Sequence, residues 1–158
     1  MRHGAAIFCI TLLLFTIPNS TAQESDNQSL DIEFDWSYDL GDVFVSTKPL
    51  IEKEMIFVRT STSNPNSDSA GVFAFDLEGE MIWQSENSNS TYHDMSPLLF
   101  VKSGEGDCGS WSDMLVLGWS DGAVEALNPN TGETIWEQKT EKITWGITGS
   151  MLVDEDNL

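Results

Sequence analysis

Cysteine, histidine and basic residues are scarce in this sequence. Its 158 residues include two cysteines, two histidines and seven lysines and arginines. Beyond the N-terminal segment described below, Cys108 and His93 are the only residues of their kinds. The remaining chain therefore cannot close an intramolecular disulfide, and it cannot build a Cys/His zinc site, which takes about four such ligands.

The shortage of positive charge excludes polyanionic partners. Aspartate and glutamate number 26, and the formal net charge is −19 at pH 7. Because the binding of polyphosphates depends on Lys and Arg, such a chain is repelled by DNA, RNA and anionic lipid. The acidic residues are spread along the chain, which favours a solvated surface screened by salt.

Long hydrophobic runs are also missing, with one exception near the N-terminus. Ala5–Ile17 is apolar over about 13 residues, fewer than the roughly 20 that span a bilayer. Arg2 precedes this run, and small residues ending at Ala22 follow it. The order predicts a secretory signal peptide over residues 1–22, with a membrane anchor as the alternative. We expect residues 23–30 to be a disordered linker and the mature chain to be secreted or extracytoplasmic, without a membrane span.

No segment beyond the apolar N-terminal run has the 3.6-residue apolar period of a helix. Short runs rich in Val, Ile, Phe, Leu and Trp predict strands instead, in two units of four. Polar insertions at 61–70 and 102–113 are expected to be exposed loops. The predicted strands are 43–50, 55–60, 72–77 and 81–86 in the first unit, and 92–100, 114–120, 123–128 and 134–139 in the second.

A tryptophan recurs at the same place in each unit. Trp36, Trp83 and Trp136 are 47 and 53 residues apart. A period of about 40 to 50 residues built only of strands is typical of propeller blades.

The sequence around two of these tryptophans resembles a known repeat. Ala126-Leu127-Asn128-Pro129-Asn130-Thr131-Gly132-Glu133-Thr134-Ile135-Trp136 is similar to the tryptophan-docking motif of the quinoprotein-like (PQQ-binding-like) β-propeller family, although Asn128 stands where that motif has Asp. Ala74–Trp83 is a second copy, one residue shorter. The resemblance implies structural docking roles for Ala74, Asp76, Gly79, Trp83, Ala126, Asn128, Thr131, Gly132 and Trp136.

This resemblance implies an all-β propeller of four-stranded antiparallel blades over residues 31–158. The two full blades are expected at about 43–86 and 92–139, with a third begun at 143–153. The family's rings have seven or eight blades, so the chain is expected to be truncated or a piece of a longer reading frame. Because a repeat array needs about three units to be stable, we expect these residues alone to be marginally stable or oligomeric.

Two functions follow from the resemblance. The family includes quinone-dependent dehydrogenases and the propeller lipoprotein of the outer-membrane β-barrel assembly machinery. The quinone ligands, the calcium ligands and the catalytic aspartate of the enzymes cannot be mapped onto this chain. We therefore expect an exported, non-catalytic scaffold that binds a protein or glycan partner, or the blades that follow. The alternatives are an N-terminal fragment of a PQQ-dependent dehydrogenase and a gene remnant without function.

No residue is assigned a catalytic, cofactor-binding or metal-binding role. His93-Asp94 beside serines could suggest a hydrolase, but one dipeptide shows no triad geometry, and a structural histidine is preferred. The acidic tail 154–157 lacks the glycine and the distal glutamate of an EF-hand calcium loop, which favours a solvated tail. The weaker candidates are Glu105, Asp107 and Asp113 as calcium ligands, Cys108 as a free thiol, and Asn27 and Asn89 as glycosylation sites.

Export gives the first testable prediction. Because the N-terminus has the three parts of a signal peptide, the secreted protein should begin near Gln23 when its N-terminus is sequenced. A soluble cytoplasmic product that retains Met1 would contradict the prediction.

Overall fold

The computed structural model describes residues 33–63, 70–88, 93–107, 109–141 and 146–153. The chain divides into two units, residues 1–34 and 35–158, and the first contributes only Glu33 and Phe34 to the described residues. The predicted signal peptide and linker lie outside the described residues. The described part of the chain is built of strands and holds no helix that could cross a membrane.

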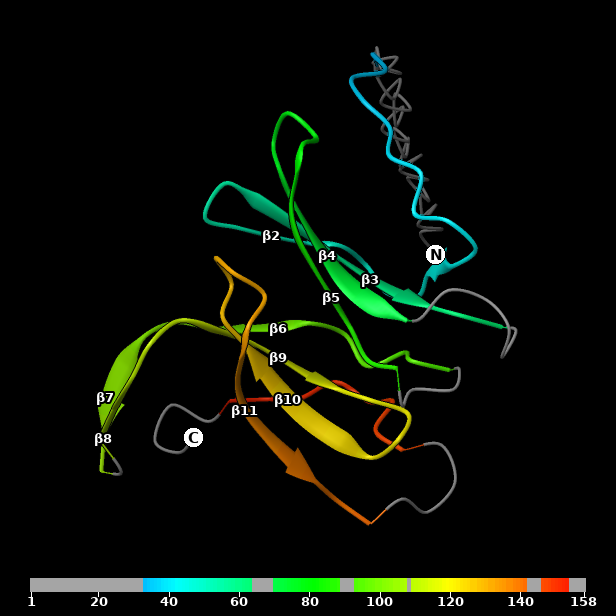
Figure 1. Ribbon diagram of the computed structural model, residues 1–158. Coiled ribbons are helices and arrows are strands. Elements are labelled where there is room, and N and C mark those ends of the chain that lie inside the picture. Colours follow the sequence, from blue (N-terminus) through cyan, green and yellow to red (C-terminus); the bar gives the residue numbers. More distant parts are fainter. Residues whose placement is uncertain (1–32, 64–69, 89–92, 108, 142–145, 154–158) are drawn as a thin grey trace, which may run out of the picture. The chain divides into compact units, whose positions relative to one another are not determined.

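Residues 35–158 contain two antiparallel sheets that correspond to the two predicted repeats (Figure 1). Within each sheet, antiparallel strands follow one another in chain order, as in a propeller blade. The prediction of an all-β fold built of antiparallel propeller blades is therefore confirmed. The first blade consists of β1 (Phe44–Val45), β2 (Leu50–Glu52), β3 (Met55–Ser61), β4 (Gly71–Asp76) and β5 (Met81–Glu86). The second consists of β6 (Leu99–Val101), β9 (Met114–Gly118), β10 (Ala123–Leu127) and β11 (Thr134–Lys139).

The first strand of the first blade is divided, and the prediction of one strand over 43–50 was wrong. Its two parts, β1 and β2, both pair with β3, and their registers are shifted relative to each other. Pro49, directly before β2, has no N–H to donate to a ladder. The Ser46 N–H still donates to the Arg59 carbonyl at 3.1 Å, and the chain then leaves the ladder and returns to it at Leu50.

The first strand of the second blade is shorter than the predicted 92–100. Only β6 pairs with β9, and residues 93–98 form no regular strand. Two side chains replace the missing ladder bonds. The Ser96 hydroxyl accepts the Gly118 N–H at 3.2 Å, and the Asp94 carboxylate accepts the Ser120 N–H at 2.9 Å. The buried N–H groups of Gly118, at the end of β9, and of Ser120, just beyond it, are thus satisfied without a continuous strand.

The described residues of the insertion at 102–113 are largely exposed, as predicted, but they are not all loop. The insertion contains a hairpin of β7 (Gly104–Gly106) and β8 (Gly109–Trp111). Trp111 donates its indole N–H to the Lys102 carbonyl at 2.8 Å. A Cβ on Gly104 would lie 2.7 Å from the Trp111 ring, so the indole packs directly on this glycine. The insertion at 61–70 falls mostly outside the described residues.

Residues 146–153, where a third inner strand was expected to begin, form no regular strand. They nevertheless contact the second blade. The Ile147 N–H donates to the Trp119 carbonyl at 3.0 Å, and the Ser96 hydroxyl donates to the Gly149 carbonyl at 3.1 Å. The segment therefore lies along the second blade without completing a sheet.

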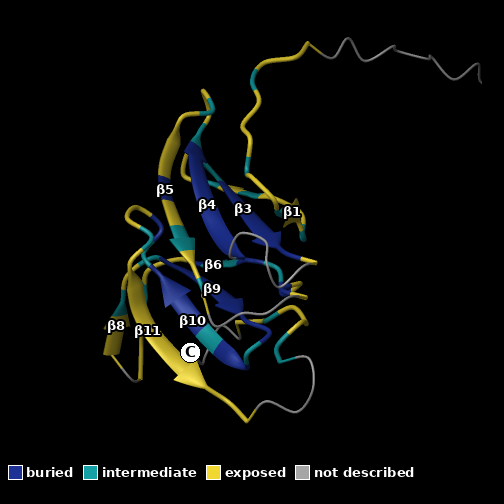
Figure 2. Ribbon diagram, turned by 45° about the vertical axis from the view of Figure 1, so that its right-hand side comes forward, coloured by how far each residue is buried: buried dark blue, intermediate teal, exposed yellow. Residues whose placement is uncertain are grey.

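Alternating residues of each blade face opposite sides, as strand geometry requires. Phe57, Val72 and Ala74 of the first blade pack in one cluster with Leu115 and Leu117 of the second. The intervening residues Val58, Phe73 and Phe75 form a separate cluster on the other side of the first blade. Figure 2 shows β3, β4, β9 and β10 buried, whereas β5 and β11 are largely exposed. The main core thus lies between the blades.

The bridging role of Ser96 is testable. In Ser96→Ala, the Gly118 N–H loses its acceptor at a buried position, which should lower the free energy of unfolding by about 1–3 kcal/mol. Urea unfolding followed by tryptophan fluorescence measures this loss. Ser110→Ala, in the exposed strand β8, is the matched control and should change stability little. Equal stability of the two variants would contradict the role given to Ser96.

Candidate functional site

One predicted tryptophan joins the first blade to the second. Trp83 lies on β5, pairs with Ala74 on β4 and is 8% exposed. Its indole N–H donates to the Pro129 carbonyl of the second blade at 2.9 Å. A Cβ on Gly132 would lie 2.5 Å from the Trp83 ring, so only a glycine lets the ring approach this closely. Burial of an indole stabilises such a contact by up to about 4–6 kcal/mol.

The turn that receives Trp83 is held by Asn128. Its side-chain oxygen accepts the Asn130 N–H at 2.9 Å, and its carbonyl accepts the Gly132 N–H at 2.8 Å. Gly132 has a φ of 71°, a left-handed conformation that favours glycine. The Thr131 hydroxyl accepts the Glu133 N–H at 3.3 Å. The amide of Asn128 therefore supplies the acceptor that a turn carboxylate would supply.

The corresponding turn in the first blade is one residue shorter but also begins with a polar residue and contains a left-handed glycine. The Asp76 carboxylate accepts the Glu80 N–H at 2.8 Å, and Gly79 has a φ of 89°. This turn receives Trp36, whose indole N–H donates to the Leu77 carbonyl at 3.2 Å. A Cβ on Gly79 would lie 2.4 Å from the Trp36 ring. Trp36 comes from a segment without strand structure and is only half-buried.

Trp136 has the surroundings of Trp83 on its own blade but lacks a receiving turn in the described structure. It pairs with Ala126 as Trp83 pairs with Ala74, and each ladder has an irregularity directly after the alanine. Every residue of β11 is exposed, and Trp136 is 38% exposed. Of the nine predicted docking residues, Trp83 and the turn residues Asn128, Thr131 and Gly132 form one contact, beside Ala74. Asp76 and Gly79 belong to the turn of the other contact. Ala126 lies on the second blade opposite Trp136, whose indole remains open.

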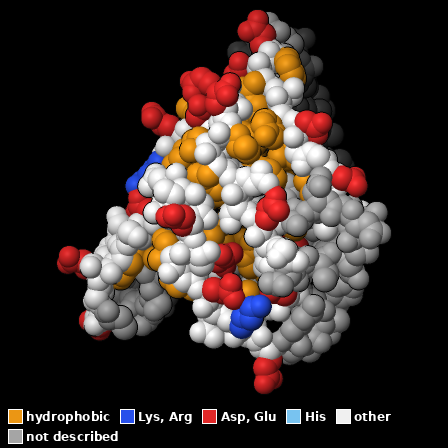
Figure 3. Space-filling view, in the orientation of Figure 1, with side chains coloured by type: hydrophobic (Ala, Val, Ile, Leu, Met, Phe, Trp, Pro, Cys, Tyr) orange, Lys and Arg blue, Asp and Glu red, His pale blue; other side chains and the backbone are white. Residues whose placement is uncertain are grey.

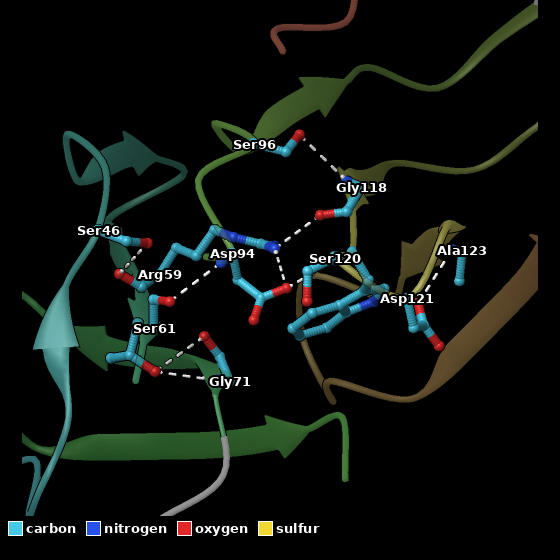
Figure 4. A network of polar contacts seen from close by, with 12 residues as sticks. Ser46, Arg59, Ser61, Gly71, Asp94, Ser96, Gly118, Ser120, Asp121 and Ala123 are labelled. Atoms are coloured by element: carbon cyan, nitrogen blue, oxygen red, sulfur yellow. Dashed lines mark hydrogen bonds and ion pairs between the residues drawn. The ribbon is translucent and has the colours of Figure 1, made fainter. Parts of the chain in front are cut away.

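Sequence reasoning missed a charged cluster between the blades, drawn in Figure 4. Arg59, in the second half of β3, is completely buried. Its Nη2 donates to the Gly118 carbonyl at 2.6 Å and lies 3.6 Å from the Asp94 carboxylate. Its guanidinium also stands 4.5 Å from the centre of the Trp119 ring, within reach of a cation–π interaction. One side chain of the first blade therefore contacts three residues around the second.

The electrostatics of this cluster keep Arg59 charged. Burial lowers the pKa of Arg59 to about 10, although the charges of Asp94 and Glu125 act in the opposite direction. Glu125 is itself held by the Trp119 indole N–H at 2.7 Å and the Thr134 hydroxyl at 2.6 Å. Because a pKa near 10 leaves the group protonated at pH 7, the interface contains a buried cation facing two carboxylates.

Not every hydrogen-bond donor of this cluster has an acceptor. The Arg59 Nε and Nη1 atoms are buried and have no hydrogen-bond acceptor in the described structure. Such an unmatched donor opposes folding by about 1–3 kcal/mol. The sequence signal was the single charge inside the otherwise uncharged strand Met55–Ser61. A charge at a buried strand position indicates a paired site, although its partners cannot be read from one sequence.

The other candidates do not form a catalytic or metal site in the described structure. His93 is exposed with a φ of 73°, whereas the neighbouring Asp94 is buried against Arg59 and the Ser120 N–H. Asp113 accepts the Ser103 N–H at 2.7 Å and pairs with Lys53, apart from Glu105 in β7. Cys108, Asn27, Asn89 and residues 154–157 lie outside the described residues.

A quinone with its calcium ion was the cofactor of the enzymatic alternative. Its cation would need several convergent oxygen ligands. Among the described residues, no three His, Cys, Asp or Glu side chains come together as such a set. The described residues therefore offer no acidic ligand set for that calcium ion.

Comparison with known protein families finds one match that spans most of the chain. Residues 33–157 match the family model described as outer membrane protein assembly factor BamB. The matched range contains both blades and all three tryptophan positions. No curated protein matches the chain.

The Trp83 contact can be tested through its glycine. Gly132→Ala combines a left-handed backbone with a Cβ only 2.5 Å from the Trp83 ring, and should lower the free energy of unfolding by about 2–4 kcal/mol. Gly109→Ala has positive φ but meets nothing within 4 Å, so it measures the backbone effect alone. Gly149→Ala meets nothing within 4 Å and should be nearly neutral. Urea unfolding that finds Gly132→Ala no worse than Gly109→Ala would contradict the packing described.

Proposed function

We propose that this chain, which belongs to the PQQ-like repeat family, is an exported, non-catalytic propeller module that binds a protein partner. The match to the family model described as outer membrane protein assembly factor BamB shows the membership. Localisation outside the cytoplasm and cleavage after Ala22 are parts of this proposal. The nine docking residues predicted from the sequence serve, in this proposal, to join neighbouring repeats and not to bind a small ligand.

The main support for a non-catalytic role is that the buried polar residues at the blades are engaged in structural contacts. Arg59 bonds to the Gly118 carbonyl, and Asp94 accepts the Ser120 N–H. Glu125 accepts from Trp119 and Thr134. These groups are buried and engaged in contacts that join strands, whereas catalysis requires a group within reach of a substrate. Arg59, Asp94 and Glu125 are therefore used in structural contacts.

The exposed surface supports binding of a protein. Figure 3 shows hydrophobic side chains gathered on one face, with Asp and Glu around them and few Lys or Arg. Ile51 on β2 is 63% exposed, and Ile82 on β5 is 46% exposed. Exposed apolar residues within a polar surround are typical of protein interaction sites. The acidic surround favours a partner that carries positive charge.

Cross-linking tests this proposal in the cells that produce the protein. A photoreactive amino acid at Ile51 or Ile82 should give a discrete conjugate with a second polypeptide. The matched control position is Glu105, a charged residue that is exposed on the β7–β8 hairpin. A conjugate that contains sugar but no second polypeptide would contradict a protein partner.

The enzymatic alternative is tested separately. The purified full chain, given quinone and calcium, should neither bind quinone stoichiometrically nor support dye-linked oxidation of alcohols or sugars. Stoichiometric quinone binding would contradict the non-catalytic proposal and favour a fragment of a dehydrogenase.

A further inference from the structure

Lys53 and Glu54 form a turn that is unfavourable for residues with side chains. Glu52 pairs with Met55, so these two residues alone join β2 to β3. Their φ angles are 53° and 60°, and positive φ at both central positions is typical of a type I′ turn, which favours Asn-Gly. A left-handed conformation disfavours residues that have a Cβ. Two such residues in one turn indicate that at least one of their side chains has a role there.

The Lys53 side chain reaches from this turn to the second blade. Its ammonium donates to the carboxylate of Asp113, just before β9, and lies 5.8 Å from the centre of the Phe100 ring in β6. A carboxylate and an aromatic ring both attract an ammonium ion. The other Asp113 oxygen accepts the Ser103 N–H at 2.7 Å, which fixes the direction of the carboxylate. Asp113 and Phe100 therefore form a cation site, here called the lysine site, and Lys53 occupies it.

The lysine site is accessible from outside. The Lys53 side chain is 51% exposed, and that of Asp113 is 18% exposed. Such an exposed ion pair is weak, because water and salt compete with it. The left-handed turn that carries Lys53 weakens the pair further. A second lysine can therefore reach Asp113 and replace Lys53.

We propose that the lysine site binds a lysine of the protein partner, and that Lys53 occupies the site until the partner's lysine displaces it. This inference rests on the proposed function, since it names the group by which a positively charged partner is recognised. The exchange replaces one ammonium by another, so the carboxylate always keeps a counter-charge. The formal net charge of −19, with Glu52 and Glu54 on either side of Lys53, favours such a partner. Displacement also frees the turn from its left-handed conformation.

A second exposed lysine pair of the chain serves as a comparison. Lys139 of β11 lies 3.3 Å from the Asp121 carboxylate, whose other oxygen accepts the Ala123 N–H at 3.0 Å. The two side chains are 57% and 11% exposed, close to the values for Lys53 and Asp113. Lys139 belongs to a strand and not to a left-handed turn. Lys139→Gln and Asp121→Asn are therefore matched controls.

Calorimetric titration of the full chain with an acetylated, amidated tetralysine peptide tests the proposal. The titration is made at about 0.05 M salt, where screening is weak. Lys53→Gln removes the internal occupant and should bind the peptide about two- to sixfold more tightly, because an exposed ion pair is populated only by about that factor over its open form. Lys139→Gln makes the same change in net charge and should alter the affinity by less than about twofold.

The carboxylate is tested in the Lys53→Gln background. Adding Asp113→Asn should weaken peptide binding at least about threefold more than adding Asp121→Asn, although both changes remove one negative charge. An asparagine at either position can still accept the N–H of Ser103 or Ala123. Both variants should therefore keep the native circular dichroism spectrum.

Lys53→Gly separates recognition from a structural role. Glycine is favoured at positive φ, so this variant should unfold at no lower urea concentration than the unaltered chain. It should bind the peptide at least as tightly as Lys53→Gln, since the internal occupant is again absent.

Three results would overturn the proposal: equal gains in affinity from Lys53→Gln and Lys139→Gln, equal losses from Asp113→Asn and Asp121→Asn, or a Lys53→Gly chain that unfolds more easily and binds no more tightly. If one of these occurs while the cross-linking probes on the first blade still capture a second polypeptide, the lysine site is wrong and the proposed protein-binding function stands.

Discussion

The interface between the two blades is the constraint on which the rest of the structure depends. A blade has two apolar faces, and each neighbouring blade can cover one of them. Here the first blade contributes Phe57 and Trp83 to the shared core, and the second contributes Leu115 and Leu117. Neither sheet has a comparable core of its own, so each blade owes its ordered packing to the other.

A buried charge inside this interface adds specificity to an otherwise apolar contact. Arg59 meets the Gly118 carbonyl, the Asp94 carboxylate and the Trp119 ring, and these lie on or beside one blade. A displaced register would leave the guanidinium buried without a counter-charge, which is far less favourable than a displaced methyl group. The ion pair therefore defines one relative position of the blades, even though such pairs add little net stability.

Much of the fold could be predicted from the sequence, because strand alternation and the spacing of Trp36, Trp83 and Trp136 are local signals. The turns of Gly79 and Gly132 were also predictable, since positive φ selects glycine. The first strands were not, because their division depends on side chains such as Ser96 that replace ladder bonds. Arg59 was missed because its partners are 35 and 59 residues away, and a single sequence does not pair distant residues.

Native-state hydrogen exchange tests most directly whether the two blades form one cooperative unit. The account predicts that amides of β4 and β10, such as those of Ala74 and Ala126, open with the same free energy, because both strands depend on the shared core. It predicts that Arg59→Met lowers protection in both strands together. Opening of β10 at a much lower free energy than β4, with Arg59→Met affecting only one of them, would contradict the account.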